Sequence, residues 1–121
     1  MSDIRTKRLF SVLDESVDAV LIVNSGLPFL DDNFRYLTDI VGGVFESSFA
    51  VATPKGVTVI TSIMEESIAM SSGCKVKVAG SRDDLAGILK SALHGRKVVG
   101  VNMSGISHST MKWARRTLKG V

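Results

Sequence analysis

The five-residue apolar run at positions 19–23, Ala-Val-Leu-Ile-Val, constrains the fold of this chain more than any other stretch. The run is continuous rather than alternating, which is typical of strands covered on both faces in the middle of an α/β sheet. It is far shorter than the roughly 18 to 20 residues that a membrane span requires, and no other apolar run approaches that length. We therefore predict a buried central strand and no membrane partner.

Periodicity and turn residues predict further elements around this strand. In the sequence Thr53-Pro54-Lys55-Gly56, Pro and Gly stand where a type I turn accepts them, so the flanking segments are predicted to form an antiparallel hairpin. Ser62 and Glu65, and likewise Ser81 and Asp84, have the spacing of residues that cap the start of a helix. The predicted elements are a helix at 3–16, the strand at 19–23, extended segments at 44–52 and 57–61, a helix at 62–73, a strand at 74–79, a helix at 81–94, a strand at 97–101 and a helix at 107–119.

The order of these elements predicts the fold class. A hairpin followed by alternating helices and strands requires parallel strand pairs joined by helical crossovers, and therefore a mixed sheet with helices on its faces. A chain of 121 residues has room for one domain with a real core. We predict a single three-layer α/β domain over residues 1–121. Its sheet is expected to be mixed and largely parallel, with about five strands, a β-hairpin and flanking helices in a ribonuclease H-like arrangement.

Residues 31–39 bring together charged, amide and aromatic side chains that could form a functional site. They follow the central strand and are predicted to form a loop with about one helical turn. A polar and aromatic loop at the end of a central strand is a natural place for a binding or catalytic site. Adjacent aspartates are nevertheless more often solvated turn formers than acid–base or metal-binding groups. The stretch is Asp31-Asp32-Asn33-Phe34-Arg35-Tyr36-Leu37-Thr38-Asp39.

Nothing else in the sequence completes a catalytic constellation. Phosphate-loop, dinucleotide-binding, nucleophile-elbow and zinc-binding motifs are missing. His94 and His108 are predicted at helix ends, and the single cysteine, Cys74, is predicted to be a small buried apolar residue. We therefore predict no catalytic residue, no metal site and no cofactor in this chain. One cysteine and a start without the apolar core of a signal peptide lead us to expect a cytoplasmic protein.

The last predicted helix separates into three faces. An apolar stripe faces the core, a basic face lies elsewhere, and Trp113 points away from both. An indole off the core stripe often marks a contact with another domain or chain, and we predict that role for Trp113. Cations near a helix C-terminus are locally favourable, so the basic face is predicted to be solvated and no nucleic-acid partner is expected. The stripe comprises Met111, Ala114 and Leu118, and the basic face comprises Lys112, Arg115, Arg116 and Lys119.

Three stretches of the sequence carry a resemblance to a known family. They are Arg8-Leu9 with residues 13–22, the run Asn33-Phe34-Arg35-Tyr36-Leu37-Thr38, and residues 49–61, where a strand enters a Pro/Gly turn and returns. In this order they resemble the opening helix and first strand, the Tyr-Leu-Thr loop and the hairpin of the amino-terminal domain shared by creatinase, prolidase and aminopeptidase P. The resemblance covers essentially the whole chain. Relatives commonly have Gly after Tyr-Leu-Thr, whereas this chain has Asp39, which leads us to expect a different bend in the loop.

The resemblance implies that the chemistry lies on another part of the protein. In this family a separate carboxy-terminal domain of pita-bread fold carries the reaction, and in the peptidases its aspartate, histidine and glutamate ligands hold two divalent metal ions. This chain would then be the non-catalytic amino-terminal domain of a metal-dependent Xaa-Pro dipeptidase- or aminopeptidase-like hydrolase, ending about where the connection to the catalytic domain begins. The implied partners are that catalytic domain, a second subunit of a homodimer and, indirectly, a peptide substrate.

The resemblance also implies a role for the stretch at 31–39. It places Asn33, Arg35 and Tyr36 at the substrate-facing rim of the active site, where Arg35 could donate a fork of hydrogen bonds to a peptide carboxylate. An ion pair between Arg35 and a neighbouring aspartate explains that arginine equally well. The alternative function is a free-standing module that binds a protein or a small ligand through the same stretch.

Overall fold

The computed structural model describes residues 2–13, 16–24, 32–38, 40, 48–101 and 108–118 of the chain. Helices and strands alternate after a central hairpin, as the sequence predicts. The elements are α1 (Ser2–Val12), β1 (Ala19–Asn24), α2 (Asp32–Thr38), β2 (Ser48–Thr53), β3 (Gly56–Thr61), the 3₁₀ helix η1 (Ile63–Glu65), α3 (Glu66–Met70), β4 (Lys75–Val78), α4 (Arg82–Leu93), β5 (Val99–Val101) and α5 (His108–Thr117).

The strands form one mixed sheet in the order β4-β3-β2-β1-β5. Strand β2 is antiparallel to both of its neighbours, whereas β3 pairs with β4 and β1 pairs with β5 in parallel. Four strands therefore run in one direction and β2 in the other, which confirms the predicted mixed, largely parallel sheet with a hairpin. The ends of β1, β3, β4 and β5 meet the start of β2 along one border of the sheet, which we call the carboxyl edge.

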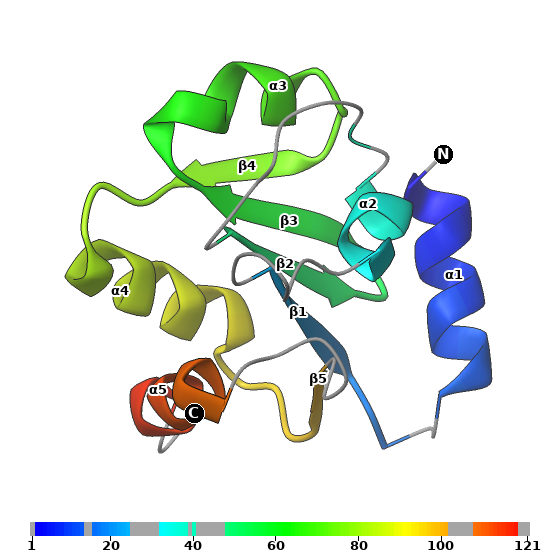
Figure 1. Cartoon of the computed structure of the whole chain (residues 1–121). Helices are drawn as coiled ribbons and strands as arrows, with labels where there is room; N and C mark the ends of the chain where they lie inside the picture. Colours follow the sequence, from blue (N-terminus) through cyan, green and yellow to red (C-terminus); the bar gives the residue numbers. More distant parts are fainter. Residues whose placement is uncertain are drawn as a thin grey trace.

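Alternate side chains along the strands face two separate cores, one on each side of the sheet. Figure 1 shows α1 and α2 on one side of the sheet and α4 and α5 on the other, which gives the predicted three layers. The α2-side core contains Val20, Ile22, Phe34, Leu37, Ile40, Ala50, Ala52, Val57, Val59 and Ala69. The α4-side core contains Ala19, Leu21, Val23, Phe49, Val51, Ile60, Leu89 and Leu93.

Both cores bury large apolar side chains completely. Phe34 and Leu37 of α2 are 1% and 2% exposed, and Leu89 and Leu93 of α4 are inaccessible to solvent. Each such side chain contributes roughly 1.5–3 kcal/mol through the apolar surface it removes from water. The continuous run at 19–23 is explained by this arrangement, because its neighbouring residues enter opposite cores and all are buried.

A buried pair of hydroxyls joins β2 to β3 at the carboxyl edge. Ser48 Oγ and Thr61 Oγ1 lie 2.8 Å apart within hydrogen-bonding distance, and both residues are almost inaccessible to solvent. A buried hydroxyl without a partner costs free energy, so this mutual bond allows two polar residues to sit beside the core.

The predicted start of α4 is confirmed in detail. Ser81 Oγ accepts a hydrogen bond of 3.1 Å from the backbone N–H of Asp84, as expected of an N-cap residue. Asp84 Oδ2 in turn accepts a bond of 3.3 Å from the backbone N–H of Gly80. The helix ends before Gly95, whose φ of 79° lies in the left-handed region that glycine adopts readily.

The predicted start of the preceding helix is only partly correct. Ser62 is the N-cap residue of η1 in an extended conformation, but its side chain makes no capping hydrogen bond. The backbone N–H of Glu65 bonds to the carbonyl oxygen of Ser62 at 3.2 Å instead, which produces a 3₁₀ turn before α3. Helix α3 ends at Met70, short of the predicted end at Gly73. Strand β2 begins at Ser48, and residues 44–47 of the predicted extended segment lie outside the described residues.

The border opposite the carboxyl edge is held by Asp18. Its Oδ2 and Oδ1 accept hydrogen bonds from the backbone N–H groups of Lys97 and Val98 at 3.0 and 3.3 Å, and these bonds fasten β5 beside β1. The N–H of Lys97 lowers the pKa of the Asp18 carboxyl from its ordinary value, and the N–H of Val98 acts in the same direction. Within the described ranges, no helix is long and apolar enough to cross a membrane.

Candidate functional site

The stretch predicted as a loop with about one helical turn at 31–39 contains the seven-residue helix α2, which corrects that prediction. Seven residues are helical because Phe34 and Leu37, three positions apart, fall on one side and enter the α2-side core. Thr38 Oγ1 supports the helix end by donating to the carbonyl oxygen of Phe34 at 2.8 Å and accepting from the N–H of Ile40 at 3.4 Å. Asp31 and Asp39, with the predicted bend at Asp39, lie outside the described residues.

The predicted rim residues Asn33, Arg35 and Tyr36 all belong to α2. Tyr36 is 45% exposed, and the side chains of Asn33 and Arg35 lie outside the described part of the chain. The guanidinium of Arg5 in α1 lies 5.0 Å from the centroid of the Tyr36 ring, and its Nη1 donates a bond of 2.8 Å to the Tyr36 carbonyl oxygen. Arg5 therefore fastens α1 to α2 and holds the exposed ring in place. Contact of the three rim residues with a substrate stays a prediction.

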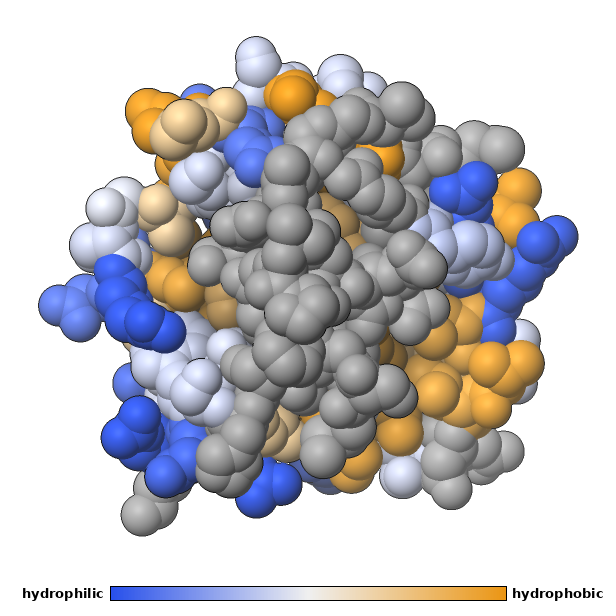
Figure 2. Space-filling model, in the orientation of Figure 1, coloured by the Kyte–Doolittle hydropathy of each residue, from blue (hydrophilic) through white to orange (hydrophobic). Residues whose placement is uncertain are grey.

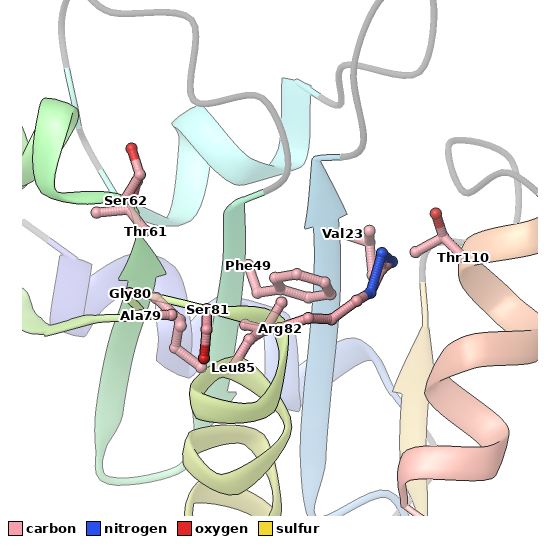
Figure 3. A pocket seen from close by; sticks show the side chains of 11 residues that line it. Val23, Phe49, Thr61, Ser62, Ala79, Gly80, Ser81, Arg82, Leu85 and Thr110 are labelled. Atoms are coloured by element: carbon pink, nitrogen blue, oxygen red, sulfur yellow. The ribbon is translucent and has the colours of Figure 1, made fainter.

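A cavity of about 290 Å³, which we call the edge pocket, opens at the carboxyl edge on the other side of the sheet. Crevices outside the carboxyl ends of strands are the usual ligand sites of α/β sheets. Figure 3 shows side chains from the ends of β1 and β3, the start of β2, the start of α4 and the first turns of α5 converging on it. The lining comprises Val23, Phe49, Ile60, Thr61, Ser62, Ala79, Gly80, Ser81, Arg82, Leu85 and Thr110.

No local motif marks the edge pocket, and the sequence reasoning missed it. Its lining comes from segments that are far apart along the chain, such as Val23, Ser62 and Thr110. The position of polar residues in the sequence could have predicted it. Polar residues directly after predicted strands, such as Ser62 and the pair Ser81-Arg82, lie at one edge of the sheet when those strands are parallel.

Trp113 packs inside the domain beside this pocket, which corrects the helical-wheel placement. Its ring centroid lies 5.9 Å from that of Phe49, and the guanidinium of Arg82 lies 5.1 Å from the indole. The residue is half-buried and packs against the α4-side core. The wheel assigns directions at the backbone only, whereas an indole is long enough to reach back to the core. A contact between Trp113 and another domain or chain stays a prediction.

The described part of α5 otherwise follows the predicted faces, and Lys119 lies outside the described residues. Ala114 is buried, Met111 and Leu118 pack against the α4-side core, and the basic side chains Lys112, Arg115 and Arg116 are exposed. Figure 2 shows hydrophilic surface gathered at the lower left, where α4 and α5 lie in Figure 1.

The described thiol and imidazole groups lie apart from one another: Cys74 is on the α2 side and His94 follows α4. Cys74 packs against the α2-side core but is half-buried rather than buried as predicted, and its Sγ donates to the carbonyl oxygen of Thr38 at 3.4 Å. His94 is exposed directly after α4, and the side chain of His108 lies outside the described residues. Among the described residues, no three His, Cys, Asp or Glu side chains come together as metal ligands. The described residues therefore offer no ligand set for the two-metal centre, which the family resemblance places in the separate catalytic domain.

Comparisons with known proteins point to one family. A family model described as Creatinase/Prolidase N-terminal domain matches residues 5–121. The fold resembles X-Pro aminopeptidase from Thermotoga maritima MSB8, with a TM-score of 0.78, 18% identity and coverage of 95% of this chain and 31% of that chain. It also resembles Xaa-Pro dipeptidase from Bacillus anthracis, with a TM-score of 0.76, 18% identity and coverage of 98% and 32%.

Another similar structure consists almost entirely of the matching domain. It is the Creatinase/Prolidase N-terminal domain of an X-Pro dipeptidase from Streptococcus pyogenes, with a TM-score of 0.69, 11% identity and coverage of 99% of this chain and 94% of that chain. No curated protein gave a significant match. The chain spans about a third of the two peptidases from Thermotoga and Bacillus and nearly all of the Streptococcus domain. This chain belongs to the creatinase/prolidase N-terminal domain family.

Proposed function

We propose that this chain is the non-catalytic amino-terminal domain of a metal-dependent Xaa-Pro dipeptidase- or aminopeptidase-like hydrolase, and that it contributes to dimerisation and to the active-site rim. One observation carries the proposal: the family match extends over residues 5–121, yet the chain covers only 31% of the Thermotoga peptidase. The divalent metal pair and the reaction are accordingly assigned to a catalytic domain outside these residues.

The α2 surface supports the rim role. Helix α2 follows the central strand β1, its apolar residues anchor it in the core, and Tyr36 remains on the surface in an orientation held by Arg5. In this proposal Asn33, Arg35 and Tyr36 face the substrate end, and Arg35 donates hydrogen bonds to a peptide carboxylate. A rigid helix places such groups more precisely than a loop would.

The first test is hydrolysis by the pure 121-residue chain. We expect no cleavage of Xaa-Pro dipeptides or longer Xaa-Pro peptides with Mn²⁺, Co²⁺ or Zn²⁺ added. Metal-dependent turnover that co-purifies with the chain would overturn the non-catalytic assignment. The reading frame after Val121 provides an independent check: spaced Asp, His and Glu residues in a following domain support the proposal, whereas a frame that ends there favours the free-standing binding module.

The rim role is tested in the protein that includes the catalytic domain. Arg35→Ala is expected to raise KM for an Xaa-Pro peptide by roughly 10- to 100-fold, because a charge-assisted hydrogen bond contributes about 1.5–3 kcal/mol. The metal content should stay unchanged. Arg8→Ala, which removes an exposed arginine from α1, is the matched control. An unchanged KM in Arg35→Ala would refute the rim role while leaving the family assignment intact.

Dimerisation is tested by deletion of this domain from the same protein. We expect sedimentation equilibrium to show a dimer for the intact protein and a smaller assembly after residues 1–121 are removed. Trp113→Leu tests whether the exposed part of the indole contributes to that contact. If the deleted protein remains a dimer, the domain does not carry the subunit interface.

A further inference from the structure

The edge pocket combines a cavity, apolar walls and a cationic group in one place. We propose that it binds a small carboxylate with an apolar end, the carboxylate lying against Arg82 and the apolar end against Ala79 and Leu85. This site is independent of the peptidase role proposed above, because it lies on the α4 side of the sheet, whereas the rim residues lie on α2.

The residues that line the edge pocket differ in their solvent exposure. Val23, Phe49 and Ile60 belong to the α4-side core and are at most 3% exposed, so they form a rigid floor. Ala79 and Leu85 are half-buried and supply the apolar wall that a ligand can reach. Ligand pockets typically pair such an apolar surface with a small number of placed polar groups.

Arg82 is the cationic group at this cavity. Figure 3 shows its side chain extending from the first turn of α4 toward Val23 and Thr110, which also line the pocket. The stack on Trp113 at 5.1 Å holds the planar guanidinium beside the cavity. A guanidinium held by stacking still has its edge N–H donors free for two parallel hydrogen bonds to a carboxylate.

The opposite end of the cavity disfavours an anion, which orients the ligand. There the N–H of Gly80 already donates to the Asp84 carboxylate, and the N–H of Asp84 donates to Ser81 Oγ. The start of α4 is therefore satisfied by its own residues, and Asp84 repels negative charge. Electrostatics place the carboxylate of a ligand near Arg82 and its neutral end toward Ala79 and Leu85.

The volume limits the size of the ligand. Since a water molecule takes about 30 Å³ in the liquid, a cavity of 290 Å³ has room for on the order of ten water-sized atoms. A ligand of that size is expected to bind with a Kd on the order of millimolar. 3-Phenylpropionate matches both the size and the chemistry, and 3-phenylpropionamide is its neutral counterpart of the same shape.

The chain contains its own reporter of binding. Trp113 is the only tryptophan, so its fluorescence reports directly on the environment of Arg82. Titration with 3-phenylpropionate should change this emission saturably, whereas 3-phenylpropionamide should bind at least about tenfold more weakly. N-acetyl-Gly-Phe, titrated in parallel, distinguishes the source of the carboxylate. Tighter binding of the free acid indicates a metabolite-sized ligand, and tighter binding of the peptide indicates a chain end.

Amide chemical shifts provide a second readout that does not depend on the indole. Ligand addition should shift the N–H signals of Ala79, Gly80 and Leu85 and leave those of α1 and α2 unchanged. Arg82→Gln should weaken binding roughly tenfold or more, and Arg8→Gln, an exposed arginine on the other side of the sheet, should not. Ser62→Phe should obstruct the cavity without losing a helix cap, because Ser62 makes no side-chain capping bond. Ser67→Phe, at an exposed position of α3, is its control.

The proposal is overturned by equal binding of the acid and the amide, by unchanged affinity in folded Arg82→Gln, or by shifts confined to residues outside the pocket lining. Absence of any shift at 3-phenylpropionate concentrations well above the expected Kd would also overturn it. Urea unfolding of each variant verifies that a loss of binding does not reflect a loss of folding.

Discussion

Two arginine–aromatic pairs lie on opposite sides of the same sheet and differ in what surrounds them. Arg5 lies 5.0 Å from the Tyr36 ring on the α2 side, and Arg82 lies 5.1 Å from the Trp113 ring on the α4 side. Tyr36 is 45% exposed, and Arg5 is also bonded to its carbonyl oxygen. Trp113 is half-buried against Phe49, and its arginine borders a cavity.

The arginine–aromatic contact therefore has a different role on each side of the sheet. On the α2 side the arginine joins two helices and leaves an aromatic ring on an exposed surface, which suits contact with a substrate or another domain. On the α4 side the ring is part of the packing, and the arginine is the group presented to the cavity. The α2 side thus offers a surface, whereas the α4 side offers a pocket.

The largest expected effects test whether the two cores are equally well packed. Phe34→Ala should lower the free energy of unfolding by about 3–5 kcal/mol and Leu89→Ala by about 2–5 kcal/mol, because each leaves a cavity in a buried site. Urea titration followed by circular dichroism measures both values. A cost below about 1 kcal/mol for Phe34→Ala would mean that α2 is only loosely docked, and the contrast between the sides would need revision.

The next effect compares the two rings. Trp113→Ala should cost about 2 kcal/mol, less than a fully buried tryptophan would, since the indole is half-buried and packs on Phe49. Tyr36→Ala should cost about 0.5–1 kcal/mol, because the exposed ring loses mainly its stack with Arg5. The same urea titration applies, and a larger loss for Tyr36→Ala than for Trp113→Ala would reverse the proposed roles of the two rings.

Two serines that line the edge pocket provide a matched pair. Ser81→Ala should destabilise the domain by about 1 kcal/mol, because it removes the acceptor of the Asp84 N–H at the start of α4. Ser62→Ala should change stability by less than about 0.5 kcal/mol, since Ser62 makes no capping bond. Thermal unfolding at matched concentration measures both. Equal losses would show that Ser62 carries an interaction of its own.

The smallest effect is expected at the border opposite the pocket, from Asp18→Asn. The carboxylate accepts two backbone N–H bonds, and an amide oxygen can still accept one of them. Because the folded pKa of Asp18 is lowered, its stabilisation is fully present above the ordinary pKa of 3.8 and disappears as the pH falls through the folded pKa. Asp18→Asn should have a lower free energy of unfolding than the wild type at pH 7, and this difference should disappear in acid. A difference in the free energy of unfolding that stays constant as the pH falls would contradict the lowered pKa.

Elements governed by local periodicity could be predicted from the sequence. The run at 19–23 is buried on both faces, and Thr53 pairs with Gly56 across the predicted turn. The start of α4 at Ser81 follows from spacing alone. Each depends on neighbouring residues in the chain and is therefore visible in the sequence.

Features that depend on tertiary packing could not be predicted in the same way. The polar start of the stretch at 31–39 is typical of a turn, but burial of Phe34 and Leu37 makes it a helix. The path of the Trp113 side chain depends on Phe49 and Arg82, which lie far away in the sequence. The edge pocket likewise forms only when the strand order is known.

The reversed direction of β2 creates a site where a tag can be inserted far from the edge pocket. It places the hairpin turn at the border opposite the carboxyl edge, where Pro54 and Lys55 are exposed. A short tag inserted between these two residues would interrupt neither strand and would lie at the far end of the sheet from Arg82. The domain could thus be immobilised through this turn with its carboxyl edge directed toward the solution.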